Sequence, residues 1–113
     1  MGYETKIKLP GSNYTYNLHE NVKRFSLRDN GFIETKQGNF QLVRPLDATP
    51  QSREGFKLKI TVNKEINGFK MSITTANGLR SVDIFKDEKY KMNQDKFYFL
   101  MDGMIERNVF DKE

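Results

Sequence analysis

The sequence of 113 residues contains no cysteine and no tryptophan, and its only histidine is His19. Without cysteine the chain has no disulfide, no thiolate nucleophile and no cysteine-ligated zinc. Small secreted domains usually depend on disulfides, so this absence favours a cytoplasmic location. His19 has no serine or cysteine partner in a recognisable catalytic arrangement, and we interpret it as a turn or cap residue.

Other familiar signals are also absent. No apolar run reaches the roughly 18 residues that a transmembrane helix needs, and the start of the chain is charged where a signal peptide is apolar. The glycines do not follow a phosphate-binding or dinucleotide-binding pattern, and the acidic residues do not follow calcium or zinc spacing. We therefore expect no membrane segment, no metal site, no cofactor and no catalytic residue. An enzyme would need titratable groups that converge in a pocket.

The composition that remains is globular. Hydrophobic residues make up 36% and charged residues 30% of the chain, and the length predicts one domain spanning residues 1–113. The net charge of +4 permits an anionic partner. Because the basic residues are not gathered in blocks, solubility is the simpler interpretation of this charge.

The clearest local pattern is the alternation of apolar and polar residues over 56–86, interrupted by Asn67-Gly68 and Asn77-Gly78. A period of two places successive side chains on opposite faces of a strand, and Asn-Gly accepts the positive φ of tight hairpins. The segment therefore predicts a three-stranded antiparallel meander with one apolar face. The apolar positions are Phe56, Leu58, Ile60 and Val62, then Phe69, Met71 and Ile73, then Val82 and Ile84.

The rest of the chain predicts two hairpins and two helices. Asn93 is expected to cap a C-terminal helix, with Phe110 folding back on the core after it; the apolar face of this helix is Phe97, Leu100, Met101, Met104 and Ile105. The other elements are a hairpin of residues 3–9 and 14–18, a short helix or turn within 19–28, and a hairpin of residues 32–35 and 40–44 that Pro45 stops. In the short helix we expect Val22 and Phe25 to face the core, Asn21 or His19 to cap it and Gly31 to end it. This order predicts an α+β fold: a curved antiparallel sheet of hairpins and meander, with the short helix and the long C-terminal helix packed on one face.

The longest segment without periodicity is residues 45–55, which we expect to be a loop. Guanidinium groups bind carboxylate or phosphate through two parallel hydrogen bonds, so the arginines of this region suggest a site for an anionic ligand. Loop side chains that bond their own backbone are the simpler explanation of the same residues. The ligand-binding candidates are Arg44, Gln51, Ser52 and Arg53.

A second charged feature is a row of lysines opposite the apolar face of the meander, formed by Lys57, Lys59 and Lys70. Such a row can bind the phosphates of a nucleic acid. The aromatic residues on which bases would stack, however, share the apolar face. We therefore favour a solvated sheet face whose lysines deter aggregation, and keep a nucleic-acid-binding module as the alternative.

Several stretches resemble a small family of unknown function from Gram-positive lactic bacteria that carries the description "putative amino-acid metabolism". The stretches are Thr49-Pro50-Gln51-Ser52 and residues 55–63, 71–78 and 96–103. The resemblance implies a variant of the TATA-binding-protein-like fold, a curved antiparallel sheet with helices on one side. This agrees with the element order predicted above.

The resemblance also implies a genomic neighbourhood of amino-acid and sulfur metabolism that includes cysteine desulfurase, but it supplies no known site residues. It does not extend to DNA, because the TATA-binding protein inserts apolar wedges into the minor groove and the predicted wet face carries lysines instead. The resulting hypothesis is a cytoplasmic, non-enzymatic accessory module. Its partner would be a protein of amino-acid metabolism, such as the desulfurase, or a small anionic metabolite.

Overall fold

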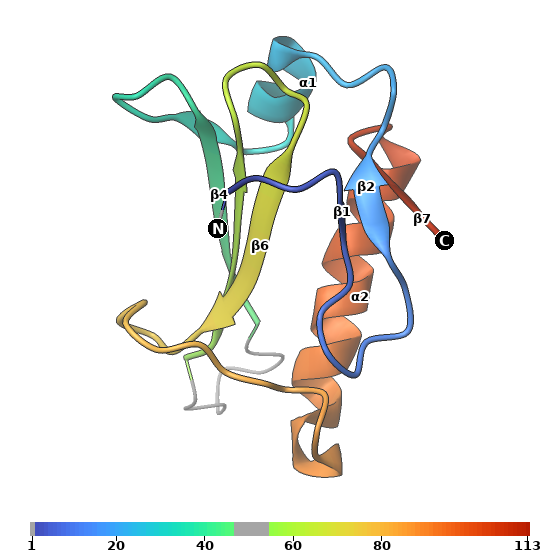
Figure 1. Cartoon of the computed structure of the whole chain (residues 1–113). Coiled ribbons are helices and arrows are strands. Elements are labelled where there is room, and N and C mark those ends of the chain that lie inside the picture. The colour runs from blue at the N-terminus through green and yellow to red at the C-terminus, as the bar shows by residue number, and fades with distance from the viewer. Residues whose placement is uncertain (1, 47–54) are drawn as a thin grey trace.

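The computed structural model describes residues 2–46 and 55–113, which form two antiparallel sheets with a short and a long α-helix (Figure 1). The predicted α+β class is confirmed. The elements in chain order are β1 (Lys6–Ile7), β2 (Tyr16–Leu18), α1 (Arg24–Asp29), β3 (Ile33–Glu34), β4 (Phe40–Pro45), β5 (Lys57–Val62), β6 (Phe69–Thr74), a 3₁₀ helix (Glu88–Tyr90), α2 (Lys91–Glu106) and β7 (Phe110–Lys112).

The larger sheet has the strand order β3-β4-β5-β6, and all its neighbours are antiparallel. Leu42 of β4 pairs with Ile60 of β5, which pairs with Met71 of β6, so these three residues lie on one face. All three are buried, whereas Lys59 and Lys70 are exposed. The alternation in the sequence thus correctly predicts the buried face of β5 and β6.

The smaller sheet has the order β1-β2-β7, and the predicted N-terminal hairpin forms its first two strands. One antiparallel bridge joins this part of the chain to the larger sheet: Glu4 and Phe69 exchange both backbone hydrogen bonds, each at 2.9 Å. The sequence predicts a single curved sheet. Two sheets form instead, because the chain leaves β6 after Glu4 and its residues Lys6 and Ile7 pair with β2.

The sequence predicts a third meander strand after Asn77-Gly78, and this prediction is wrong. Val82 donates its backbone N–H to the carbonyl of Ile73 at 2.8 Å, and the chain then leaves β6. Asp83 turns the chain, because its Oδ1 accepts from the backbone N–H of Phe85 at 2.9 Å. The meander of the structure is therefore β4-β5-β6, and the run that follows β6 forms backbone hydrogen bonds with the end of that strand.

The connection between β5 and β6 is longer than a two-residue Asn-Gly turn. Asn63 holds it together, since its Oδ1 accepts from the backbone N–H groups of Asn67 and Gly68 at 3.0 and 3.2 Å. The positive φ lies at Ile66 (56°) and not at the Asn-Gly pair. In the next turn Gly78 does have a positive φ of 76°, as the second Asn-Gly pair predicts.

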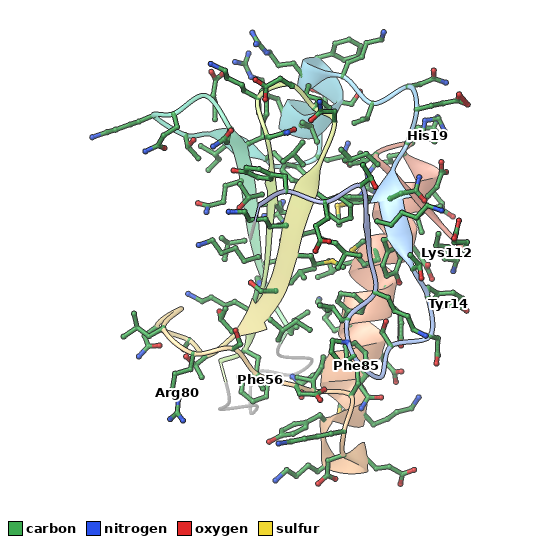
Figure 2. All side chains as sticks on the ribbon, in the orientation of Figure 1. Tyr14, His19, Phe56, Arg80, Phe85 and Lys112 are labelled. Atoms are coloured by element: carbon green, nitrogen blue, oxygen red, sulfur yellow. The ribbon has the colours of Figure 1, made fainter. Side chains whose placement is uncertain are left out.

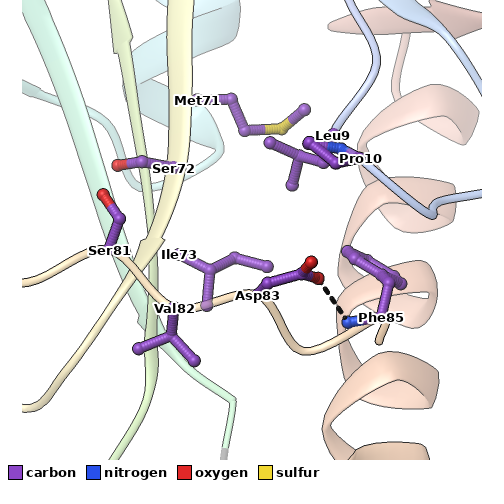
Figure 3. A pocket seen from close by; sticks show the side chains of 9 residues that line it. All are labelled: Leu9, Pro10, Met71, Ser72, Ile73, Ser81, Val82, Asp83 and Phe85. Atoms are coloured by element: carbon purple, nitrogen blue, oxygen red, sulfur yellow. Dashed lines mark hydrogen bonds between the residues drawn. The ribbon is translucent and has the colours of Figure 1, made fainter. Parts of the chain in front are cut away.

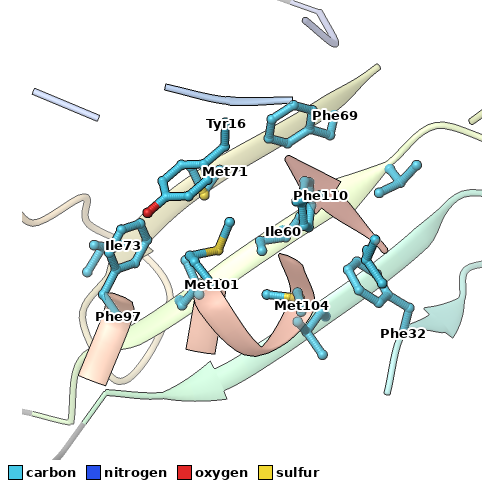
Figure 4. Close-up of a cluster of buried hydrophobic side chains, with 14 of the residues drawn as sticks. Tyr16, Phe32, Ile60, Phe69, Met71, Ile73, Phe97, Met101, Met104 and Phe110 are labelled. Atoms are coloured by element: carbon cyan, nitrogen blue, oxygen red, sulfur yellow. The ribbon is translucent and has the colours of Figure 1, made fainter. Parts of the chain in front are cut away.

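The core lies between the inner face of the larger sheet and a layer formed by α2 and the smaller sheet (Figures 1 and 4). Phe97, Met101 and Met104 are the buried apolar residues of α2, which confirms its predicted apolar face. Phe110 of β7 is fully buried, with its ring centroid 5.1 Å from that of Phe69. Burying a side chain of this size stabilises the fold by about 1.5–3 kcal/mol.

The short helix α1 begins later than the sequence predicts. Phe25 is 62% exposed, and Leu27 is the residue of α1 that is buried. The N-cap is Lys23, whose backbone N–H donates to Ser26 Oγ at 3.3 Å. His19, one of the predicted caps, lies before the helix, because the chain makes a separate turn there first.

The long helix α2 begins at Lys91, so the predicted cap at Asn93 is also wrong. Asn93 lies in the first turn, where it is buried, and its Nδ2 donates to the backbone carbonyl of Leu46 at 2.9 Å. This bond ties the start of the helix to the residue that follows β4. Within residues 2–46 and 55–113, no helix is long and apolar enough to span a membrane.

Candidate functional site

A mainly apolar groove opens beside β6, between this strand, the residues after β1 and the segment that follows β6 (Figure 3). Its volume is about 360 Å³, within the range of small-molecule sites. Figure 3 shows Leu9 opposite Met71, with Phe85 on the side of α2. The lining residues are Leu9, Pro10, Met71, Ser72, Ile73, Ser81, Val82, Asp83 and Phe85.

Asp83 is the charged residue of this lining. It is exposed, and its Oδ1 is occupied by the backbone N–H of Phe85 at 2.9 Å. A carboxylate has a second oxygen and further acceptor capacity, so Asp83 is able to receive a donor from a ligand. The groove therefore combines apolar walls with one negative charge.

Sequence reasoning missed this groove. Its walls come from the N-terminal hairpin, from β6 and from the segment after β6, each of which looks like ordinary strand or turn sequence. The residue in the sequence that could have indicated the groove is Asp83, a charged residue between Val82 and Ile84 in the run predicted to be a third strand. That acidic residue marks the point where the chain leaves the sheet.

Arg44, a member of the predicted anion site, lies away from the groove. Its Nη2 donates to the backbone carbonyl of Asn30 at 3.5 Å, and its Nη1 to that of Val43 at 3.3 Å. Gly31 permits this approach: its φ is 92°, as expected of a residue that ends a helix, and a Cβ there would collide with Arg44 Nη2.

The other three members of that site, Gln51, Ser52 and Arg53, lie outside the described residues, so the predicted anion site stays a prediction. Asn30 also binds a second arginine: Arg107 Nε donates to the side-chain Oδ1 of Asn30, whose backbone carbonyl accepts from Arg44. The two arginines are far apart in the sequence, and no spacing rule would have paired them.

The lysine row is exposed as predicted at Lys59 and Lys70 and half-exposed at Lys57. The strand pairing places nine residues on the outward face of β4–β6, and none of them is acidic. Tyr3 also lies there, with its ring centroid 4.6 Å from Lys70 Nζ. The outward positions are Gln41, Val43, Pro45, Lys57, Lys59, Thr61, Lys70, Ser72 and Thr74.

His19 lies at the end of β2, away from the groove residue Phe85 (Figure 2). Its Nδ1 accepts from the backbone N–H of Asn21 at 3.0 Å, which fits its interpretation as a turn residue. Among the described residues, no cluster of histidine, aspartate and glutamate is placed to hold a metal ion.

Of the groups in residues 2–46 and 55–113, two have raised pKa values, and neither lines the groove. Burial raises the pKa of Tyr16, whose hydroxyl has no hydrogen-bond partner among the described residues. The hydrogen bond from Lys112 Nζ to Asp102, at 2.9 Å, raises the pKa of Lys112. Lys112 Nζ also lies 4.1 Å from the ring centroid of Tyr14 (Figure 2).

Comparison with known proteins supports the resemblance seen in the sequence. A family model described as "putative amino acid metabolism", DUF1831, matches residues 1–111. A crystal structure of a DUF1831 family protein from Lactobacillus plantarum is similar, with 36% sequence identity and a TM-score of 0.90, over 100% of this chain and 99% of that chain. No curated protein matches the chain. The chain therefore belongs to the DUF1831 family.

Proposed function

We propose that this protein is a binding module of amino-acid metabolism and that the groove beside β6 is its ligand site. The observation that carries the proposal is the groove itself, in which apolar side chains from three segments surround a pocket that has one carboxylate at its wall. Pockets of this kind, mostly apolar with few polar groups, are typical of binding sites. The family description supplies the metabolic context.

The lining favours a ligand with an apolar group and a positively charged or hydrogen-bond-donating end. Its charged member is Asp83, and it includes no lysine or arginine among the described residues. A carboxylate attracts an ammonium group and repels an anion. The groove is thus not a site for the small anionic metabolite predicted from Arg44 and Arg53, which would have to bind elsewhere.

Three further parts of the proposal rest on sequence and family reasoning. These are the accessory, non-enzymatic role, the cytoplasmic location and a protein partner such as cysteine desulfurase. For catalysis, the groove offers Asp83 as its one acidic or basic side chain within the described part of the chain. A single carboxylate lacks the second proton-transfer group that general acid–base catalysis usually needs.

The test is an NMR titration of the ¹⁵N-labelled protein with the standard amino acids and their amides. We expect shifts at Met71, Asp83 and Phe85, and weaker binding by Asp83→Asn. Asp87→Asn is the matched control, because Asp87 also accepts from a backbone N–H two residues later, at 3.0 Å from Lys89, and does not line the groove. Shifts elsewhere only, or none with any compound, would count against the groove as the site.

The second candidate function is nucleic-acid binding through the lysine row. Two observations favour it: the outward face of β4–β6 has no acidic residue, and Tyr3 offers an aromatic ring beside Lys70. Binding should weaken steeply with salt and should be lost when Lys57, Lys59 and Lys70 are all changed to glutamine. A salt-independent response, or equal loss in a triple glutamine variant of Lys86, Lys89 and Lys91, would remove this candidate.

A further inference from the structure

We propose that the groove binds the amino-terminal residue of an extended peptide, which pairs with the main chain of Met71 as a one-residue addition to the edge of β6. This inference rests on the proposed function and names the ligand class of the same site. It depends on the backbone of β6, on the segments that already pair with that edge, and on Asp83.

The backbone groups of alternate β6 residues point away from β5. Phe69 exchanges both hydrogen bonds with Glu4, and Ile73 receives one through its carbonyl from Val82. Because hydrogen-bonding direction alternates along a strand, the N–H and C=O of Met71, midway between them, point to the same edge. Among the described residues no partner binds these two groups.

The open part of this edge is one residue long. Glu4 occupies the position opposite Phe69, and Val82 occupies the position at Ile73. A long added strand would collide with one or the other. One residue of a ligand fits opposite Met71, where its N–H donates to the Met71 carbonyl and its carbonyl accepts from the Met71 N–H. The occupant is therefore a chain end rather than the middle of a peptide.

The direction of the segments that flank Met71 indicates which end of the peptide ligand binds in the groove. Both Glu4 and Val82 belong to segments that run antiparallel to β6. A ligand that runs the same way has its amino terminus toward Val82 and Asp83. Its next residue turns away from β6, because Tyr3, whose ring centroid is 4.6 Å from Lys70 Nζ, precedes Glu4 along this edge. Its terminal ammonium then lies on the side of the Asp83 carboxylate, whose Oδ1 alone is engaged by Phe85.

The side chain of the first residue should be apolar. Residues directly opposite each other on two strands point to the same face, and Met71 points inward. The first side chain of the ligand would therefore enter the groove beside Leu9 and Phe85. The carbonyl of a peptide is neutral, whereas a free amino acid would bring a carboxylate to a lining without lysine or arginine, so a peptide fits better.

The experiment compares three probes: Leu-Ser-Gly-amide, its N-acetylated form and free leucine. We expect Leu-Ser-Gly-amide to shift the resonances of Met71, Asp83 and Phe85 and to slow hydrogen exchange of the Met71 amide. Acetylation, which removes the ammonium, should weaken binding by about tenfold or more. Asp83→Asn should reduce this difference between the two peptides, and Asp87→Asn should leave it unchanged.

Three results would overturn the inference. They are equal affinity of the acetylated peptide, unchanged exchange of the Met71 amide in the complex, and free leucine binding as tightly as the peptide. If another amino acid or amide shifts the groove resonances while Leu-Ser-Gly-amide does not, the peptide inference fails and the groove remains a ligand site. If nothing shifts them, the proposed function fails with it.

Discussion

Replacing Tyr16 by phenylalanine should stabilise this protein. Tyr16 is fully buried in the core, its ring centroid is 5.9 Å from that of Phe97, and its hydroxyl has no hydrogen-bond partner among the described residues (Figure 4). A buried hydroxyl without a partner costs about 1–3 kcal/mol relative to one in water. Phenylalanine keeps the ring and removes the hydroxyl, at the expense of the few contacts that the oxygen makes.

The expected gain in the free energy of unfolding at pH 7 is about 1 kcal/mol, the low end of that cost. For a chain of this length such a gain raises the melting temperature by about 4 °C. The measurement is thermal and urea unfolding of both proteins at the same concentration. The control is Tyr98→Phe, because Tyr98 Oη accepts from the backbone N–H of Asn13 at 3.0 Å and its loss should bring no gain.

The advantage of Tyr16→Phe should grow in alkali. Burial raises the pKa of Tyr16 above its ordinary value of 10.0. Above that pH the unfolded phenol loses its proton while the folded one keeps it, so the folded state binds more protons and stability falls with rising pH. The slope is about 1.4 kcal/mol per pH unit for this one group, and it starts only near pH 10.

Comparing wild type with Tyr16→Phe from pH 7 to pH 11 isolates this effect, because the other tyrosines are common to both proteins. The gap between them should stay constant up to about pH 9.5 and widen above it. A variant that is less stable than wild type at pH 7 would show that the hydroxyl is hydrogen-bonded in solution. A constant gap through pH 11 would refute the raised pKa.

Two further substitutions test the packing described above. Gly31→Ala should cost about 1–2 kcal/mol in the free energy of unfolding, because its φ is left-handed. The new Cβ would meet Arg44 Nη2, the end of a flexible side chain that can move aside, so Gly78→Ala, whose Cβ would meet open space, should cost about as much in chemical denaturation. A loss at Gly31 that is larger by more than about 1 kcal/mol would show that Arg44 is held in place. Asn93→Ala should cost about 1–3 kcal/mol, since it removes the amide that donates to the carbonyl of Leu46, and a loss below about 0.5 kcal/mol would show that this bond is unimportant.

The sequence predicts the elements whose pattern is local. Alternation fixes the buried faces of β5 and β6, and the spacing of Phe97, Met101 and Met104 fixes the face of α2. Sequence reasoning fails where a residue that suits a local role is used for a distant contact instead. Asn93 suits a helix cap, yet its amide bonds Leu46, a partner 47 residues away that no local rule reveals.

The groove was beyond sequence reasoning for a related reason. Leu9 and Met71 line the same groove although they are far apart in the sequence, and the bridge between Glu4 and Phe69 joins their two segments. Local rules assign strands but do not say which edges meet. The structure describes one residue of the predicted anion site, Arg44, which lies against Gly31 and Asn30. The rest of that site stays a prediction.

The bridge between Glu4 and Phe69 has a mechanical consequence. Among the described residues it supplies the backbone hydrogen bonds that join the segment before β1 to the larger sheet. The smaller sheet that follows is held a second time, because Tyr16 and Phe110 are fully buried and the ring centroid of Phe110 lies 5.1 Å from that of Phe69. The pocket wall that carries Leu9 and Pro10 is therefore held both at the strand edge and in the core, so its separation from Met71 should vary little and the site should select ligands by their girth.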